Sequence, residues 1–231
     1  CAGRIIGMQC IARGWKSAAV LHPRFSLGER GIENFVICSV WFAGYPSAAS
    51  EVWTVESELS EMWEIRDELQ ELFGPQALCL SNAWDFAYRW ESLGAPALEI
   101  GKVVIADRYI HTALVRDVIR GIDEEYVRTL YSFVPPPDFL IYLDTSPKIA
   151  YDRKINNGLD IGYFEAGRDV VRRAANLRLS FETFQGQCRT RYDNILIGMP
   201  VAKIDGDRPA AETHAEILAA VLTHLEQNKR D

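Results

Sequence analysis

The sequence predicts an open, three-layer α/β fold, and two observations support this class. Short apolar segments rich in β-branched and aromatic residues alternate with longer segments that have helical spacing, as expected of repeated βα units. The predicted strands are apolar at nearly every position rather than at every second one, which indicates a parallel sheet buried on both faces. In folds of this kind, ligands bind beyond the carboxyl ends of the strands.

Five segments are predicted as strands, and turn signals separate them from the predicted helices. The strands are expected at residues 4–9, 34–42, 102–106, 138–144 and 201–205. Gly101 precedes the third strand and Pro135-Pro136-Pro137 precedes the fourth, as is typical of a chain that turns before entering a sheet. Helices are expected at residues 56–73, 76–93, 112–121, 124–133, 147–157, 171–194 and 209–227.

The length and charge of the chain limit its organisation and its partners. With 231 residues, we expect one domain over residues 1–231 with a full core. A formal charge of −7 argues against a nucleic-acid or membrane-surface binder that works through a broad basic face. The five scattered cysteines form no C-x-x-C pair, which fits a reducing cytoplasm. We therefore expect a cytoplasmic protein that binds neither nucleic acid nor membrane.

The clearest short motif is Ala106-Asp107-Arg108-Tyr109, which follows the third predicted strand directly. Its charged side chains are therefore expected at the carboxyl edge of the sheet, where a ligand would bind. Arginine suits a phosphate ligand there, because its planar guanidinium donates two parallel hydrogen bonds to phosphate oxygens. A structural ion pair at the end of the strand is the alternative interpretation of Asp107 and Arg108.

Further motifs occur in a fixed order around this one. A helix ends in P-A-L before G-K-V-V-I-A-D-R-Y, then P-D-F-L-I-Y-L-D precedes P-K-I-A-Y-D-R, and K-I-D-G precedes the last predicted helix. This ordered set resembles the thymidylate kinase family, P-loop enzymes that transfer a phosphoryl group from ATP to dTMP. The resemblance covers about residues 76–228 and implies a P-loop kinase fold. Members are commonly dimers, so a homodimer is a further expectation.

Extended towards the amino end, the resemblance places residues 10–17, C-I-A-R-G-W-K-S, in the P-loop position. A P-loop pattern reads G-x-x-x-x-G-K-[ST], and its glycines let backbone N–H groups surround the phosphates. Here Cys10 and Trp15 replace the two glycines, and Trp15 adds bulk where the backbone would face the phosphates. The loop is therefore altered at the positions that matter most for its shape.

The remaining residues of this loop keep an expected role in binding ATP. The resemblance implies that Lys16 contacts the β- and γ-phosphates of ATP and that Ser17 ligates Mg²⁺. Gly14, one position early, is expected to replace part of a missing glycine. Arg13 lies where some members carry an arginine that stabilises the transferred phosphoryl group. An ordinary helix start with a surface lysine is the alternative interpretation.

The acceptor nucleotide is expected to contact the second half of the motif set. The resemblance implies that Arg108 binds the acceptor's phosphate and that Asp107 organises Mg²⁺ or the acceptor. The family's other phosphate-binding arginine aligns with Phe86, and Arg89 lies one helical turn later on the same face. Packing in the core is the alternative for Phe86, and a solvated position is the alternative for Arg89.

Three further positions complete the expected acceptor site. Tyr109 follows Arg108 directly and is expected to pack more than to react. Thr112 lies where the family usually carries a hydroxyl, and Arg116 lies where the family reads the base with Tyr-Gln. Because Arg116 is not that pair, we expect it either to contact a different acceptor or to pair with Asp117.

A lid over ATP is expected at about residues 158–175, with Arg168 as its phosphate-binding arginine. Cations in such a lid stabilise charge on the moving phosphoryl group and displace water. A solvated run of charges is the alternative interpretation. The four histidines show no metal-ligand spacing, so Mg²⁺ carried by ATP is the expected metal, and His111 is expected on the surface.

Three functions remain open from the sequence. The first is a nucleoside monophosphate kinase that transfers the γ-phosphoryl group of ATP to dTMP or a similar nucleotide. The second is a catalytically weak or inactive relative that binds a nucleotide or a partner protein, as the replaced glycines suggest. The third is a kinase with another phosphate donor or acceptor, such as polyphosphate or a different nucleotide.

Overall fold

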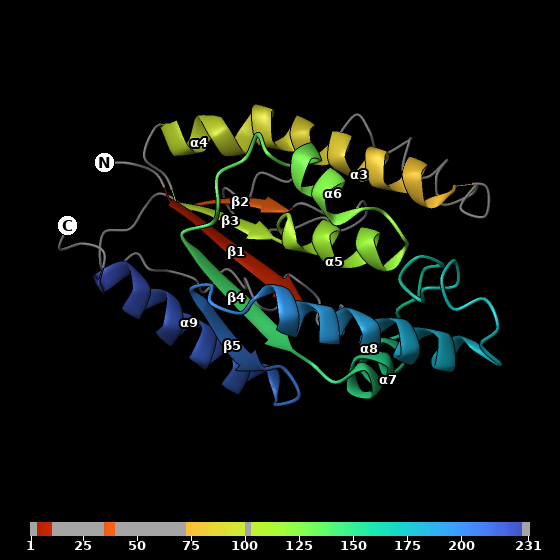
Figure 1. Cartoon of the computed structure of the whole chain (residues 1–231). Helices are drawn as coiled ribbons and strands as arrows, with labels where there is room; N and C mark the ends of the chain where they lie inside the picture. Colours follow the sequence, from red (N-terminus) through yellow and green to blue (C-terminus); the bar gives the residue numbers. More distant parts are fainter. Residues whose placement is uncertain (1–3, 11–34, 40–72, 100–102, 228–231) are drawn as a thin grey trace.

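The computed structural model describes residues 4–10, 35–39, 73–99 and 103–227 of the chain (Figure 1). In these residues, five strands form one parallel sheet in the order β2-β3-β1-β4-β5. They are β1 (Arg4–Cys10), β2 (Phe35–Ser39), β3 (Val103–Asp107), β4 (Phe139–Asp144) and β5 (Val201–Asp205). The parallel α/β sheet predicted from the apolar segments is confirmed.

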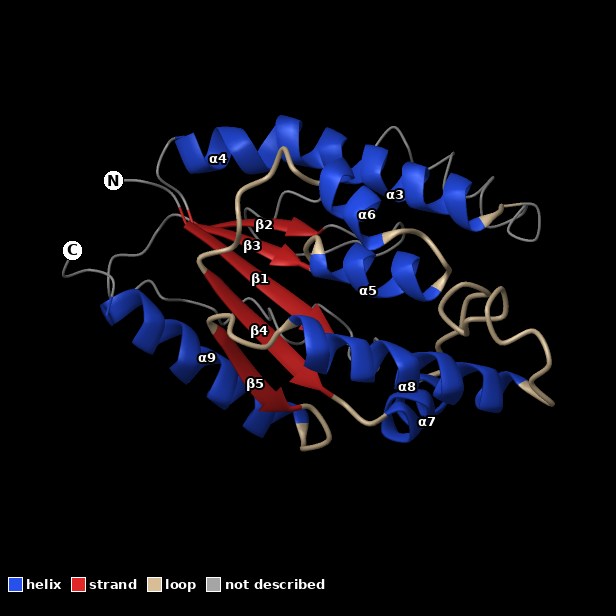
Figure 2. Cartoon of the chain, in the orientation of Figure 1, coloured by secondary structure: helices blue, strands red, loops and turns tan. Residues whose placement is uncertain are grey.

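Helices cover the sheet and alternate with its strands (Figure 2). They are α3 (Pro75–Arg89), the π-helical η2 (Trp90–Gly94), α4 (Ala95–Glu99), α5 (His111–Ile119), α6 (Glu124–Leu130), α7 (Pro147–Asn156), α8 (Leu177–Ile195) and α9 (Ala210–Gln227). The helix predicted at residues 56–73 lies outside the described residues, except for its last position. Among the helices that are described, none is long and apolar enough to cross a membrane.

Strand β4 shows how the two faces of the sheet are covered. Leu140 and Tyr142 pack with residues of α5 and α8 in one core cluster. Ile141 and Leu143, which alternate with them, pack with α9 in another. Because successive side chains of a strand point to opposite faces, α9 covers one face, and α5 and α8 cover the other. Both faces are therefore buried, which explains why the strand has no polar alternation.

The helix predicted at residues 76–93 is divided by a π-helical turn. Pro96 has no backbone N–H and cannot make the hydrogen bond that a regular helix requires at its position. The wider turn of η2 ends at Gly94, two residues before this proline, and joins α3 to α4. Gly94 closes the turn under the Trp90 ring, where an added Cβ would lie 2.7 Å from Trp90 Cε3.

Helix α8 begins later than the prediction of residue 171. Asn176 has an extended backbone, and its side chain accepts a hydrogen bond from the N–H of Leu179 at 2.9 Å. This is the N-cap arrangement that starts a helix. The residues before it form turns, and Val170 and Val171 pack against the core cluster of α5 and α8. The prediction that this helix starts at residue 171 is therefore wrong.

Candidate functional site

The carboxyl ends of the strands lie at one edge of the sheet, beside the start of α5 (Figure 1). Strand β3 ends at Asp107, which is in register with Met8 of β1 and Ser39 of β2. Strand β1 continues to Cys10, which is in register with Leu143 of β4. The carboxyl ends of β1, β2 and β3 therefore lie together. Arg108, which directly follows β3, is the first residue of the candidate site.

Arg108, the residue directly after β3, has an unusual backbone conformation. Its φ is 70°, and in the described part of the chain no other residue except glycine has a positive φ. A left-handed conformation at such a residue costs of the order of 1–3 kcal/mol. The side chain is 3% exposed, and its buried Nε has no hydrogen-bond partner among the described residues. A strained, buried arginine with an unused donor is the arrangement expected where an anion binds.

Arg116 of α5 and Arg120, the residue that caps the end of this helix, extend the positive charge around Arg108. The guanidinium carbon of Arg116 lies 5.7 Å from the centre of the Phe184 ring, and that of Arg120 lies 5.0 Å from it. Burial lowers the pKa of Arg116, and the charge of Arg108 lowers it further. We call Arg108, Arg116 and Arg120 the guanidinium cluster. Positive charges that lie near one another favour the binding of an anionic group.

Arg120 is bound by two side-chain contacts. Its Nε donates to Asp169 Oδ2 at 2.6 Å, and its Nη2 donates to the carbonyl oxygen of Phe164 at 2.9 Å. The Arg120 side chain is 3% exposed in this ion pair. Arg120 therefore holds residues 164–169 against the end of α5, which is a structural role.

A hydroxyl pair lies beside the same charges. Tyr192 of α8 donates to the hydroxyl oxygen of Thr112 at 3.3 Å, and both residues are buried. Burial raises the pKa of Tyr192, whereas the charge of Arg108 lowers it. Tyr192 is thus near both Arg108 and Thr112. The structure therefore brings together three of the predicted acceptor residues, Arg108, Thr112 and Arg116.

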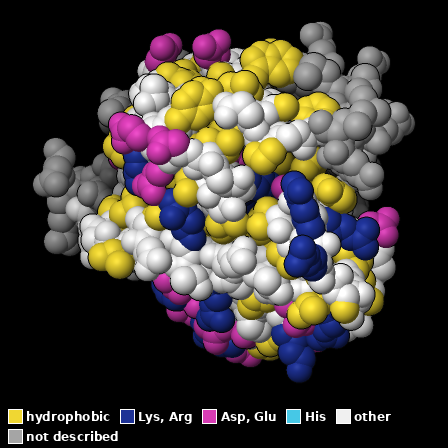
Figure 3. Space-filling model, turned by 45° about the vertical axis from the view of Figure 1, so that its right-hand side comes forward, with side chains coloured by type: hydrophobic (Ala, Val, Ile, Leu, Met, Phe, Trp, Pro, Cys, Tyr) yellow, Lys and Arg dark blue, Asp and Glu magenta, His cyan; other side chains and the backbone are white. Residues whose placement is uncertain are grey.

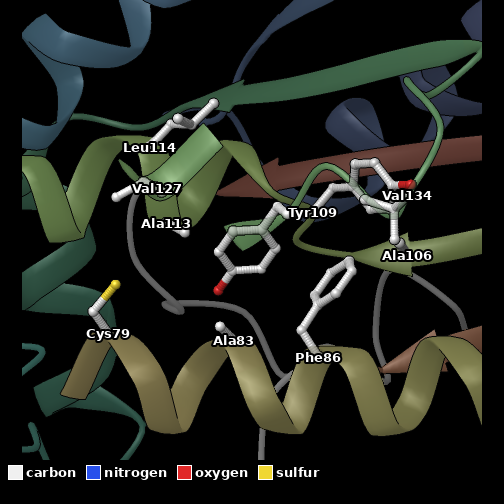
Figure 4. Close-up of a cluster of buried hydrophobic side chains, with 10 residues drawn as sticks. Cys79, Ala83, Phe86, Ala106, Tyr109, Ala113, Leu114, Val127 and Val134 are labelled. Atoms are coloured by element: carbon white, nitrogen blue, oxygen red, sulfur yellow. The ribbon is translucent and has the colours of Figure 1, made fainter. Parts of the chain in front are cut away.

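Phe86 and Tyr109 lie in a separate, aromatic environment (Figure 4). The centre of the Phe86 ring is 5.5 Å from that of Tyr109 and 5.3 Å from that of Tyr131. Both contacts have the edge-to-face arrangement that aromatic pairs favour. Phe133 lies 6.3 Å from Phe86. We call these four residues the aromatic cluster. The Tyr109 hydroxyl donates to the carbonyl oxygen of Pro135 at 2.7 Å, so the polar atom of this buried ring has a partner.

Arg89 forms an ion pair within its own helix. Its Nη2 lies 3.0 Å from Asp85 Oδ1, one helical turn earlier, and both side chains are buried. This carboxylate takes up part of the arginine's charge. The expected contact of Arg89 with an acceptor phosphate is not tested by this geometry and stays a prediction.

Comparison with known proteins decides the family. A family model named Thymidylate kinase matches residues 63–217, which is more than half of the chain. The chain belongs to the thymidylate kinase family. It is 37% identical over 139 residues to probable thymidylate kinase 2 of Saccharolobus solfataricus, and 41% identical over 73 residues to probable thymidylate kinase of Pyrococcus abyssi. These matches cover 60% and 32% of this chain. They span 65% and 36% of the two relatives, less than two thirds of either.

A solved structure extends the likeness to the whole fold. The crystal structure of thymidylate kinase from Ehrlichia chaffeensis matches 96% of this chain and 100% of its own, with a TM-score of 0.63 and 14% sequence identity. At this identity the likeness concerns the fold. The parallel sheet and its helices therefore form the P-loop α/β fold of the thymidylate kinase family, as the ordered motifs implied.

The ATP side that the thymidylate kinase pattern predicts falls mostly outside the described residues. Arg13, Gly14, Lys16 and Ser17 all lie there. Cys10, the first residue of the altered loop, ends the central strand β1. Asp107 ends β3, and its side chain lies outside the described part of the structure. The predicted roles of these residues stay predictions.

The segment at residues 158–175, predicted as the lid, is attached at several points. Lys154 Nζ donates to Glu165 Oε2 at 2.5 Å, and Ser180 Oγ donates to the carbonyl oxygen of Ala166 at 2.9 Å. Gly167 has a φ of 66°, and an added Cβ there would collide with Phe184. With the bonds from Arg120, these contacts fix residues 164–169 against α5 and α8.

Basic side chains gather on the side of the molecule where this segment lies (Figure 3). Within the segment, Arg168, Arg172 and Arg173 are exposed. Arg172 and Arg173 line an open hollow of about 500 Å³ together with Leu179 and Thr183 of α8. Residues 164–169 therefore pack against the core, whereas the three arginines of the segment are exposed to solvent.

The expectation that His111 lies on the surface is wrong. His111 is 3% exposed, and its buried Nδ1 has no hydrogen-bond partner in the described structure. Burial, together with the charge of Arg128, lowers its pKa from 6.5 to about 4. The reason is its place as the first residue of α5, where it lies next to the Tyr109 ring and near Arg128 of α6. Motif spacing alone did not show that α6 approaches this point.

Sequence reasoning named Asp117 only as a possible partner of Arg116 and did not predict its burial between the two clusters. Asp117 is 1% exposed, and burial raises its pKa from 3.8 to about 6. It forms a hydrogen bond with the Cys79 thiol, whose pKa burial raises to about 12. The charge of Arg120 affects the Asp117 pKa more than that of its neighbour Arg116 does.

Proposed function

We propose that this chain is a nucleoside monophosphate kinase of thymidylate kinase type, which transfers the γ-phosphoryl group of ATP to dTMP or a similar nucleotide. Membership of the thymidylate kinase family supports a nucleotide kinase. The observation that carries the proposal is Arg108, which directly follows β3 with a strained backbone and a buried, unused donor. This is where the family resemblance expects the acceptor's phosphate.

In the proposed reaction, the protein acts mainly by positioning and by charge. Arg108 binds the acceptor's phosphate, and its fixed backbone holds that phosphate in one place relative to the sheet. Burial at this point keeps water from the phosphate and strengthens the electrostatic attraction. Phosphoryl transfer needs little covalent chemistry from the protein, so no covalent intermediate is expected.

The donor side of the proposal depends on the sequence pattern. Lys16 and Gly14 would bind the phosphates of ATP, and Arg13 would stabilise the transferred group. A hydroxyl from Ser17 and a carboxylate from Asp107 are hard oxygen donors, the kind that Mg²⁺ prefers. When bound, Mg²⁺ neutralises charge on the phosphates of ATP.

We further propose that residues 158–175 act as the lid of a single domain over residues 1–231. Arg168 is exposed in this segment and would contact the phosphates of ATP. The attachment of residues 164–169 to α5 and α8 supports a lid that is already ordered beside the acceptor site. An Arg168→Gln variant is then expected to lose turnover more than dTMP affinity.

We propose that the chain forms a homodimer in the cytoplasm. Leu80, Trp84 and Tyr88 are 44%, 48% and 36% exposed and recur every four residues along α3. Such an apolar stripe suits contact with a second copy of the chain. Sedimentation of the wild type and a Trp84→Glu variant tests this, and a monomeric wild type would contradict it. The free thiols of Cys79 and Cys188 fit a reducing compartment.

A coupled assay that follows ADP release tests the kinase proposal. We expect turnover with ATP–Mg²⁺ and dTMP, measured beside a panel of other nucleoside monophosphates. Arg108→Gln is expected to lower kcat/KM roughly 100-fold, because it removes charge-assisted hydrogen bonds to the acceptor. Arg178→Gln is the matched control, since Arg178 is an exposed arginine that pairs with Asp152 and Glu182. Equal activity of the Arg108 and Arg178 variants would contradict the assigned role of Arg108.

A second candidate is a catalytically weak or inactive kinase-like protein that binds a nucleotide or a protein partner. Cys10 and Trp15, in place of the P-loop glycines, favour it. Titration calorimetry with ATP–Mg²⁺ and with dTMP, each alone, separates the two. Binding of dTMP without binding of ATP supports the inactive relative. Replacing ATP by polyphosphate in the coupled reaction tests for a different donor.

A further inference from the structure

Two buried ion pairs attach residues 164–169 to the rest of the protein, and they come from different helices. Arg120, at the carboxyl end of α5, donates from Nε to Asp169 Oδ2 at 2.6 Å. Lys154 of α7 donates from Nζ to Glu165 Oε2 at 2.5 Å. All four side chains are at most 15% exposed. We call these contacts the α5 link and the α7 link.

The α5 link belongs to the helix that carries expected acceptor residues. Thr112 and Arg116 lie on α5, and Arg108 precedes its first residue by three positions. Arg120 also donates from Nη1 to the carbonyl oxygen of Arg116 at 3.2 Å and from Nη2 to that of Phe164 at 2.9 Å. One side chain thus connects the last turn of α5 to the segment predicted as the lid (Figure 1). Helix α7 carries none of the expected acceptor residues.

The α5 link is also the one nearer to Arg168 in the chain. Asp169 follows Arg168 directly, whereas Glu165 is three positions before it. On the other side of Arg168, Gly167 packs so closely against Phe184 that an added Cβ would collide with that side chain. The backbone of Arg168 is therefore fixed on both sides, while the residue itself is exposed to solvent.

The guanidinium of Arg120 has little room to move. Its central carbon lies 5.0 Å from the centre of the Phe184 ring and 5.8 Å from that of the Phe164 ring. A planar guanidinium that donates in several fixed directions determines orientation as well as distance. The α5 link therefore fixes how residues 164–169 are placed against the end of α5.

We propose that Arg120 is a positioning residue for phosphoryl transfer, which acts through Asp169 to set the place of Arg168 relative to the acceptor. This inference rests on the proposed function, in which Arg168 contacts the phosphates of ATP and the acceptor lies beside the start of α5. Transfer requires the donor and acceptor phosphates to be aligned, and a misplacement of about 1 Å can lower the rate about 100-fold. The α5 link keeps the two sides of the reaction at one fixed separation.

Steady-state kinetics of the full chain test this with two matched variants. Arg120→Gln breaks the α5 link and Lys154→Gln breaks the α7 link, so each removes one buried cation and both are expected to melt earlier. Arg120→Gln is expected to lower kcat about 10- to 100-fold and to change KM for dTMP less than about 3-fold, because alignment is lost and acceptor binding is kept. Lys154→Gln is expected to keep kcat within about 3-fold of the wild type. Equal losses of kcat in the two variants would overturn the inference.

Arg120→Lys provides a second variant that does not depend on the folding of Arg120→Gln. It keeps the positive charge opposite Asp169 and loses the planar fork. We expect it to melt closer to the wild type than Arg120→Gln does, with a kcat between those of the two proteins. A kcat equal to that of the wild type would mean that the fork positions nothing, and the inference would be wrong.

A double variant separates positioning from a general loss of stability. Residues that act as a unit have non-additive effects. Arg168→Gln is therefore expected to lower kcat less in the Arg120→Gln background than in the wild type, because an arginine that is already misplaced contributes less. In the Lys154→Gln background, Arg168→Gln is expected to have its full effect. Independent effects of Arg168→Gln in both backgrounds would contradict an action through Arg168.

Limited proteolysis tests the α5 link without turnover. Trypsin cleaves after accessible arginines, and Arg168, Arg172 and Arg173 are exposed. Cleavage at these three positions, measured by mass spectrometry, is expected to be faster in Arg120→Gln than in Lys154→Gln, because local opening near Asp169 becomes easier. Equal cleavage rates overturn the inference even if the wild type is an active kinase.

The kinetic outcomes distinguish this inference from the proposed function. Wild-type turnover with an unchanged kcat in Arg120→Gln overturns the inference alone and leaves the kinase intact. A wild type that turns over no pair of donor and acceptor contradicts the kinase, and the role of Arg120 in transfer is then wrong as well.

Discussion

Arg108 and Tyr109 are neighbours in the chain, yet they enter two clusters with opposite polar properties. Tyr109 lies in the aromatic cluster, and its one polar atom donates to the carbonyl oxygen of Pro135. Arg108 lies in the guanidinium cluster, and its buried Nε has no described partner. The polar atom of Tyr109 therefore has a partner within the protein, whereas Arg108 Nε has none among the described residues.

The difference shows how a functional site can be recognised in a well-packed protein. Buried polar atoms in proteins nearly always have hydrogen-bond partners, so an exception calls for a physical reason. Arg108 combines such an exception with backbone strain, and two further arginines are nearby. In the aromatic cluster, edge-to-face packing accounts for the choice of residues. Variants in the two clusters are therefore expected to affect different properties.

The largest expected effect is on stability, from Phe86→Ala in the aromatic cluster. Removing a ring that is 6% exposed leaves a cavity, and the free energy of unfolding is expected to fall by about 4 kcal/mol. Phe86→Leu keeps most of the volume and is expected to cost about 1 kcal/mol. Urea denaturation measures both. If Phe86 supports the acceptor's base instead, Phe86→Leu will weaken dTMP binding by more than its small loss of stability explains.

Asp169→Asn tests how much the guanidinium cluster depends on the Arg120–Asp169 ion pair. The change leaves the buried Arg120 without its ionic partner, and the free energy of unfolding is expected to fall by about 3 kcal/mol. The control is Glu182→Gln, which removes a half-exposed partner of Arg178 and is expected to cost less than about 1 kcal/mol. Similar losses in the two variants would mean that the Arg120–Asp169 pair is no more than a surface contact.

The fold was easier to predict than the site, for reasons that particular residues make clear. Residues 139–144 form a strand within the predicted range 138–144, because continuous apolar positions mark a buried strand locally. Arg108 was found because it directly follows such a strand. Arg120 and Asp169 are 49 residues apart, and no local pattern pairs them. His111 was misplaced because its burial depends on α6, which approaches only in the folded chain.

His111 lies beside the aromatic cluster and is expected to make stability depend on pH. Its pKa is about 4 in the folded protein and about 6.5 in the unfolded chain, so the unfolded chain binds the proton more readily. The stability linked to neutral His111 is present above about pH 6.5. Up to about 3 kcal/mol is lost as the pH falls towards 4. His111→Gln should remove this loss when unfolding is measured across that range, and an identical pH profile would contradict it.

Asp117 lies at the border of the two clusters, with Cys79 and Tyr131 on the aromatic side and Arg120 on the other. Burial raises its pKa to about 6 despite the nearby arginines, so the charged form is unfavourable in the folded protein. Its stabilising contribution is present below about pH 3.8 and is lost as the pH rises through 6. Asp117→Asn should therefore add up to about 2 kcal/mol at pH 8 and almost nothing at pH 3.5.

This last variant tests the division between the clusters most directly. The pH dependence from Asp117 is opposite in sign to that from His111, so the two are measured in single variants and compared with the double variant. A gain at pH 8 means that the apolar surroundings outweigh the attraction of Arg120 and that Asp117 belongs with the aromatic cluster. A loss at pH 8 would mean that the carboxylate already balances part of the guanidinium charge. The need for an external anion beside Arg108 would then be smaller than we infer.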